Sequence, residues 1–154
     1  AAVYGEGRLS GSDFQYQRLS LNAAHYRTLG KSTILALNGV AIFTNGDVPF
    51  HQMPLLGGAK RSRGYFEGKY RDKHLLLLQT EGRFAIAGRF GAVLFGGLGA
   101  VAAKITDFPA TQLRFNAGVG LRFALDKAQR INLRADYGVG YHSSGFYLTF
   151  GEAF

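Results

Sequence analysis

The side chains with the most reactive chemistry in this sequence are its histidines and serines. His142-Ser143-Ser144 places a base beside two hydroxyls, as in a hydrolase that uses an activated serine. Adjacent residues of an extended chain point apart, however, and no Asp or Asn is placed to orient His142. The 4 histidines lack metal-ligand spacing, and the chain has no cysteine. We therefore expect no catalytic residue, no metal site and no cofactor.

Two other features could suggest a ligand, namely glycine pairs and the net charge of +8. The pairs Gly118/Gly120 and Gly138/Gly140 are not phosphate loops, because no helical pattern follows them. The basic residues are spread singly along the chain instead of forming a block, which disfavours nucleic acid as a partner. The net positive charge is better explained by contact with anionic lipid, or by a polar interior that the chain itself lines.

The elements that position these residues are strands, because apolar and polar residues alternate with a period of two. Alternation is clearest in the last third, where one face of 112–125 is apolar and the other carries Arg, Asn and Gly. We expect eight strands, at about Ala2–Leu9, Phe14–Thr28, Thr33–Thr44, Lys73–Ala87, Arg89–Ala102, Gln112–Leu125, Arg130–Tyr141 and Phe146–Phe154. Short connections (29–31, Gly88, 126–129) alternate with longer or more polar ones (10–13, 45–72, 103–111, 142–145).

The length of these strands favours a membrane over water. About ten residues suit a tilted bilayer crossing, whereas strands of soluble β-sandwiches are usually about 5–6 residues long. No apolar run approaches the roughly 18 residues that a spanning helix needs. The sequence therefore predicts an all-β fold, a transmembrane antiparallel up-and-down β-barrel in one domain over residues 1–154. A soluble all-β domain is the alternative.

The connection at about 45–72 is long for a chain without an obvious element, and such loops are usually functional or disordered. Its aromatic residues, Tyr65, Phe66 and Tyr70, favour burial and argue against disorder. A loop folded into a barrel interior would bury its cationic tip, Arg61 and Arg63, which would then need an acidic partner on the wall. Glu81 lies on the next strand, on the same face as Leu77 and Gln79.

The loop carries a resemblance to a known family. The run Gly57-Gly58 … Arg63-Gly64-Tyr65 … Tyr70-Arg71-Asp72 resembles the lid-loop motif of BamA/TamA-type outer-membrane proteins, the bacterial surface antigen family. The resemblance implies that Arg63 reaches into the lumen and that Glu81 is its acidic partner. Two positions depart from the family pattern: Ser62 replaces an aliphatic residue, and Gly97 stands where an Asp is expected. A solvated loop charge is the alternative explanation of Arg63.

The C-terminal segment is also similar to that family. Phe146, Phe150 and Phe154 are expected on one face and resemble the aromatic signal by which outer-membrane proteins are handed to the assembly machinery. Family barrels have sixteen strands and periplasmic modules, so the chain is either a complete eight-stranded barrel or the C-terminal half of a larger one. No signal peptide is visible at Ala1, which suggests that one was removed or that the chain starts inside a longer protein.

The resemblance implies a non-enzymatic protein of the bacterial outer membrane that assists barrel insertion or protein translocation. Its mechanism would be strand templating with a lumen-bracing loop. The expected partners are outer-membrane lipid and lipopolysaccharide, unfolded outer-membrane proteins or assembly-complex subunits, and itself or another barrel half. A passive small barrel, serving as an anchor or plugged pore, is the second hypothesis, and an enzyme is the third.

Overall fold

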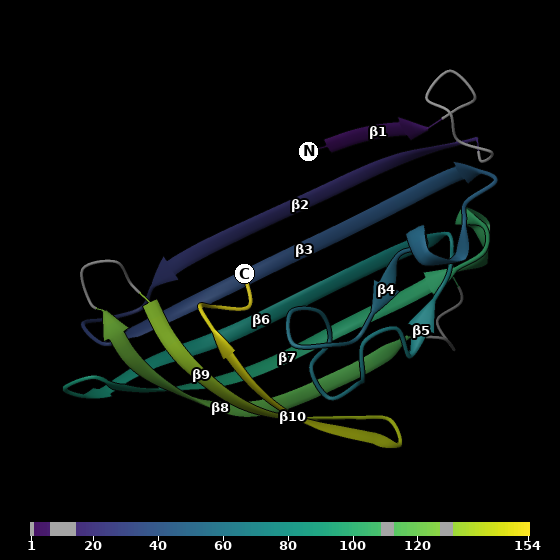
Figure 1. The fold of residues 1–154 in the computed structure, drawn as a ribbon. Helices are drawn as coiled ribbons and strands as arrows, with labels where there is room; N and C mark the ends of the chain where they lie inside the picture. Colours follow the sequence, from purple (N-terminus) through teal and green to yellow (C-terminus); the bar gives the residue numbers. More distant parts are fainter. Residues whose placement is uncertain (1, 7–14, 109–112, 127–130) are drawn as a thin grey trace.

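The computed structural model describes residues 2–6, 15–108, 113–126 and 131–154. Eight strands form one antiparallel sheet in the order β1-β2-β3-β6-β7-β8-β9-β10 (Figure 1). Their bounds are β1 Ala2–Glu6, β2 Tyr16–Thr28, β3 Thr33–Gly46, β6 His74–Ala87, β7 Phe90–Ala102, β8 Arg114–Asp126, β9 Ile131–Gly140 and β10 Ser143–Phe150. Neighbours in the sheet are neighbours in the chain, apart from the insertion between β3 and β6. This order confirms the predicted all-β, antiparallel, up-and-down fold.

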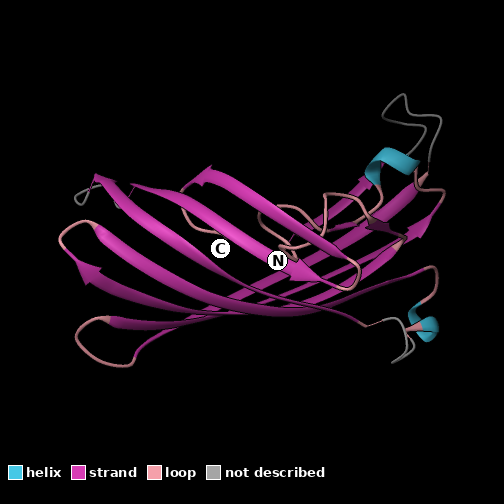
Figure 2. Ribbon diagram, turned by 90° about the horizontal axis from the view of Figure 1, so that it is seen from below, coloured by secondary structure: helices cyan, strands magenta, loops and turns pink. Residues whose placement is uncertain are grey.

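The sheet is strongly curved, and its concave side carries the β3–β6 insertion and the C-terminal residues (Figures 1 and 2). Among the described strands, β1 and β10 are not paired with each other, so the sheet is open in this structure. Within the described ranges, no helix is long and apolar enough to cross a membrane.

The two faces of the sheet differ as the alternation predicted. Along β8, Phe115, Val119 and Leu121 are exposed on the convex face, while Asn116 and Arg122 are buried on the concave one. Strand β6 repeats the pattern, since its concave face carries the buried residues Leu75, Leu77, Gln79 and Glu81. The sheet thus turns an apolar surface outward, while its inward surface carries buried polar residues beside an apolar cluster that includes Leu75 and Leu77.

The β3–β6 insertion has short elements that sequence patterning did not predict: η2 Phe50–Gln52, β4 Leu55–Leu56 and β5 Tyr70–Arg71. Two- and three-residue elements are too short to produce a periodic pattern. Strands β4 and β5 pair with each other, and Leu56 of β4 packs into a cluster on the concave face. The other buried members of that cluster are Val40, Ile42, Leu75 and Leu77.

Two expectations about the C-terminal part are wrong. The β9–β10 connection is a tight turn, not a longer loop, because His142 adopts a positive φ of 47° and Ser143 already begins β10. Phe154 does not share the face of Phe146 and Phe150, because Gly151 (φ 78°) turns the chain out of β10. The predicted connection at 10–13 lies outside the described residues.

Candidate functional site

Residues 57–65 form a compact turn that presents Arg63 to the sheet. The Gly58 amide donates to the Tyr65 carbonyl at 2.8 Å, and the Ser62 amide donates to Gln79 Oε1 at 3.3 Å. Gly64 has a φ of 111°, and a Cβ there would lie 2.6 Å from the Val139 carbonyl carbon of β9. Glycine is therefore required where the turn meets the sheet.

The Arg63 guanidinium lies between two carboxylates on strands that are not neighbours. Its Nη2 donates to Glu81 on β6, and its Nη1 donates to Asp136 Oδ2 on β9 at 2.6 Å. Its Cζ lies 3.6 Å from the ring centroid of Phe95 on β7, which is a cation–π contact. Arg63 is 1% exposed and both carboxylates are fully buried. One side chain thus ties the insertion to three strands.

The same carboxylates bind two other arginines of the concave face. Arg83 Nε donates to the second oxygen of Glu81 at 2.8 Å. Arg122 pairs with the second oxygen of Asp136 and, through Nε, with Glu152 at 3.0 Å. Each buried carboxylate is therefore shared by at least two arginines, so removing one weakens several buried ion pairs at once.

Arg134 completes the network on β9. Its Nε lies 3.2 Å from Asp136 Oδ2, and its Nη2 donates to the Ala59 carbonyl of the insertion at 2.6 Å. Asp136 therefore pairs with three arginines, whereas Glu81 pairs with two. The central charge of the site is Asp136.

Uncharged contacts hold the backbone around Arg63. Asn116 Nδ2 donates to the Arg63 carbonyl at 2.8 Å. The Gly64 amide donates to the Tyr147 hydroxyl at 3.0 Å, and that hydroxyl donates to the Tyr65 carbonyl at 2.8 Å. Strands β8 and β10 are thereby added to the strands that contact the turn.

Tyr65 is anchored at its far end as well. Its ring is fully buried, its hydroxyl donates to the Phe115 carbonyl at 2.6 Å, and it accepts from the Tyr141 amide at 2.8 Å. The ring lies over Gly140, where a Cβ would overlap its atoms. A buried tyrosine with a doubly bonded hydroxyl is a rigid anchor for the turn.

Strand β9 can approach the turn this closely because Gly138 has no side chain. A Cβ there would lie 2.7 Å from the Arg63 carbonyl carbon, so we expect Gly138→Ala to push the turn off the sheet. The free energy of unfolding should fall by about 1–3 kcal/mol, as in other overpacked sites. Urea unfolding in detergent micelles, followed by heat-modifiable migration on a gel, measures the loss. Gly39→Ala is the matched control, since its Cβ meets only a Leu78 methyl at 3.5 Å; an equal loss in both variants would contradict the close approach.

The sequence that forms this site matches a known protein family along most of its length. A family model described as the Omp85 superfamily domain matches residues 4–154. The chain belongs to the Omp85 superfamily. Proteins of this superfamily are generally associated with the outer membrane and with protein insertion or translocation, and are generally not enzymes. The match confirms the family resemblance seen in the sequence, and no curated protein matches the chain.

In this Omp85 domain, the residues assigned to the lid-loop motif lie together. Gly57, Gly58, Arg63, Gly64 and Tyr65 belong to the one turn, and Glu81 is in contact with Arg63. Arg61 lies near Arg18 of β2 instead of in the Arg63 site. Burial lowers the pKa of its guanidinium, the nearby Arg18 lowers this pKa further, and Glu67 raises it. An arginine keeps its charge at neutral pH despite such a shift.

Sequence reasoning missed Asp136 as a partner of the Omp85 turn. Its only signal was a single acidic residue on the inward face of β9, beside Arg134. At Gly97, where the family pattern has an acid, a Cβ would lie 2.6 Å from Asn116 Oδ1, so an Asp there would have to displace the Asn116 side chain. The second carboxylate of the site therefore comes from β9 and not from β7.

The remaining candidates lie away from the turn. Phe146 and Phe150 are exposed on the convex face of β10, whereas the Phe154 ring lies 5.5 Å from Arg83 on the concave side. His142 occupies the β9–β10 turn, and its carbonyl accepts from Lys69. In the part of the chain that the structure describes, no three His, Cys, Asp or Glu residues lie close enough to hold a metal ion.

Proposed function

We propose that this protein assists the insertion of other β-barrel proteins into the bacterial outer membrane, or the passage of polypeptides across it, without covalent chemistry. The observation that carries the proposal is the Arg63 turn, which is anchored to five strands on the concave face of an Omp85 domain. An anchor of this kind fixes the shape of the concave face, while the outer backbone edge of β10 stays unpaired among the described strands.

The convex surface supports a membrane location for the chain. Large apolar side chains are exposed on strand after strand, among them Leu21, Leu37, Leu78, Leu94, Leu121 and Leu148. Exposed apolar area of this extent is unfavourable in water and typical of surfaces that contact lipid. The buried arginines all lie on the opposite face, as expected for a barrel with a polar interior.

The edge of β10 supports strand templating. Among the described strands, β10 pairs only with β9, so the backbone donors and acceptors of its other edge are available to an incoming strand. Phe146 and Phe150 on its convex face would lie in the lipid during such pairing. Clients would be unfolded outer-membrane proteins, and the assembly machinery or a second barrel half could occupy the same edge.

A passive plugged barrel is the second candidate, because the insertion covers much of the concave face. Reconstitution distinguishes the two. Liposomes carrying the protein are mixed with a urea-unfolded outer-membrane barrel, and its folding is followed by heat-modifiable migration. We expect folding several-fold faster than in empty liposomes. No acceleration, with the protein itself correctly folded in the bilayer, would reject the insertion function and leave the passive barrel.

A further inference from the structure

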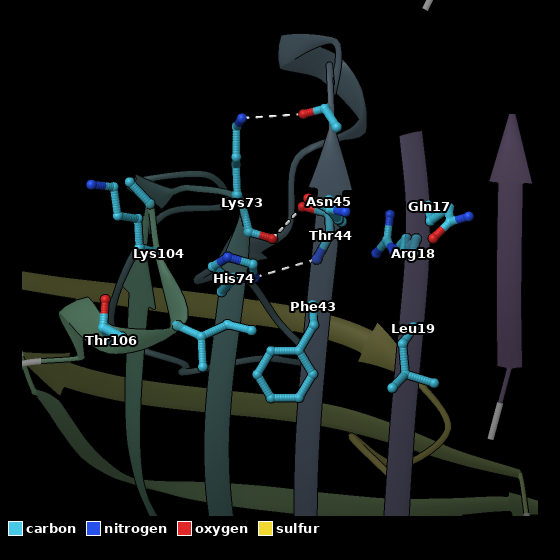
Figure 3. Close-up of a pocket in the computed structure, with 13 residues that line it drawn as sticks. Gln17, Arg18, Leu19, Phe43, Thr44, Asn45, Lys73, His74, Lys104 and Thr106 are labelled. Atoms are coloured by element: carbon cyan, nitrogen blue, oxygen red, sulfur yellow. Dashed lines mark hydrogen bonds between the residues drawn. The ribbon is translucent and has the colours of Figure 1, made fainter. Parts of the chain in front are cut away.

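A pocket outside the Arg63 site lies at the rim of the sheet, where β3 ends and β6 begins (Figure 3). It has a volume of about 720 Å³ and receives residues from β2, β3, β6 and the segment after β7. Leu19 and Phe43 are cross-strand partners and therefore share a face, which is the convex one because Leu19 is exposed. The pocket thus opens toward the surface that would contact lipid.

One end of the pocket is apolar and the other is basic. Figure 3 shows Phe43 and Leu19 at one end, and Lys73 and Lys104 toward the other. Ile105, with 63% of its surface exposed, adds to the apolar wall. An amphiphile with a charged head and an apolar tail matches this division.

The charge of the pocket selects an anion. None of the 13 described residues that line it is Asp or Glu. Lys73 Nζ makes one hydrogen bond, to the Gly46 carbonyl at 3.2 Å, which leaves other N–H donors for a ligand. Lys104 is exposed. The nearby Asp107 accepts a hydrogen bond from Thr106.

Arg18, the third cation that lines the pocket, already donates hydrogen bonds to groups of the protein. Arg18 Nε donates to the Ser20 hydroxyl at 3.3 Å, and its Nη1 donates to the Gln52 carbonyl at 3.1 Å. Lys73 and Lys104 therefore remain for the ligand. They line the end of the pocket away from the convex-face residues Leu19 and Phe43. This arrangement suits a phosphate headgroup at the boundary between lipid and water.

We propose that the pocket binds a phosphate-bearing anionic lipid. Lys73 and Lys104 contact the phosphate, and the first part of the acyl chain lies along Leu19, Phe43 and Ile105. The proposal rests on the outer-membrane location given above, and it adds a specific lipid site that neither barrel insertion nor a passive barrel requires.

The test uses the absence of tryptophan from the chain. Phe43→Trp places a fluorescent reporter in the pocket, and Phe146→Trp places a matched one on the convex face of β10. Each variant is reconstituted in phosphatidylcholine vesicles that contain a small fraction of brominated phosphatidylglycerol, which quenches tryptophan on contact. We expect stronger quenching at position 43 than at position 146, and no such difference when the brominated lipid is phosphatidylcholine.

Charge variants then identify the headgroup contact. Lys73→Gln with Lys104→Gln should weaken the preference for the anionic lipid about 30-fold, or about 5-fold for each lysine. Lys31→Gln with Arg89→Gln removes the same charge from the opposite rim and should leave the preference unchanged. Lipopolysaccharide should compete for the site, whereas inorganic phosphate at equal concentration should not.

Each outcome decides a different claim. Equal quenching by both brominated lipids at position 43, or no effect of the lysine variants, would overturn the lipid site. Displacement by inorganic phosphate as effective as by lipid would overturn the role of the acyl chain. Quenching at position 146 by any brominated lipid reports the membrane location separately, so its failure is distinguishable from failure of the pocket.

Discussion

Asp136→Asn should reduce the free energy of unfolding by about 3–5 kcal/mol, the usual effect of breaking a buried ion pair by removing one partner. The change keeps the shape of the side chain and removes its charge. Arg63, Arg122 and Arg134 would then share only Glu81 and Glu152, although all three guanidinium groups are buried. Urea unfolding in micelles, with the folded fraction read from heat-modifiable migration, measures this loss.

The matched control is Asp107→Asn, which removes the same charge from an exposed position. Asp107 lies in η3, Ile105–Asp107, where its carboxylate accepts from the Thr106 hydroxyl. Surface changes of this kind usually alter stability by less than about 0.5 kcal/mol. If Asp136→Asn were no more destabilising than this control, Asp136 would not be the central charge of the site.

Arg63→Ala should produce a loss of similar size, about 3–5 kcal/mol, by a different route. The variant leaves Glu81 with Arg83, and Asp136 with its two other arginines, but it removes the contacts to three strands at once. Arg63→Lys should recover part of the loss, because an ammonium keeps the charge but cannot bind both carboxylates in the geometry of a guanidinium.

A double-mutant cycle separates the pairing from other effects of the Arg63 change. Because Arg63 and Glu81 are in contact, the losses of Arg63→Ala and Glu81→Gln should not add, and the cycle should give an interaction energy of about 0.5–3 kcal/mol. Arg63→Ala with Asp107→Asn is the control pair and should be additive. Additivity in both pairs would show that Arg63 and Glu81 do not interact in the folded protein.

The parts of the fold that follow a simple period were predictable from the sequence. Alternation placed Leu77, Gln79 and Glu81 on one face of β6, and it separated Phe115 from Asn116 on β8, because adjacent side chains of a strand point to opposite faces. The residue pattern predicted that Arg63 needs an acidic partner and placed Glu81 on the inward face of the next strand, and the family resemblance implied that these two residues pair.

The remaining features depend on curvature and on single residues in left-handed conformations. Asp136 reaches Arg63 only because the sheet bends β9 toward β6, and these strands are separated in the sheet by β7 and β8. No local pattern in β9 reveals that approach. His142 and Gly151 each redirect the chain through one positive φ. The β9–β10 connection is therefore shorter than expected at His142, and after Gly151 the chain places Phe154 on the concave side.

Hydrogen exchange of residues 57–66 in the reconstituted protein tests most directly whether the Arg63 turn is locked to the sheet. The Gly58 amide and the Gly64 amide are both hydrogen-bonded, and Arg63 and Tyr65 are buried, so exchange should be slow in the unaltered protein. It should be much faster in Arg63→Ala, while exchange in the exposed segment 103–107 stays unchanged. Exchange at 57–66 in the unaltered protein as fast as at 103–107, with no response to Arg63→Ala, would contradict the lock.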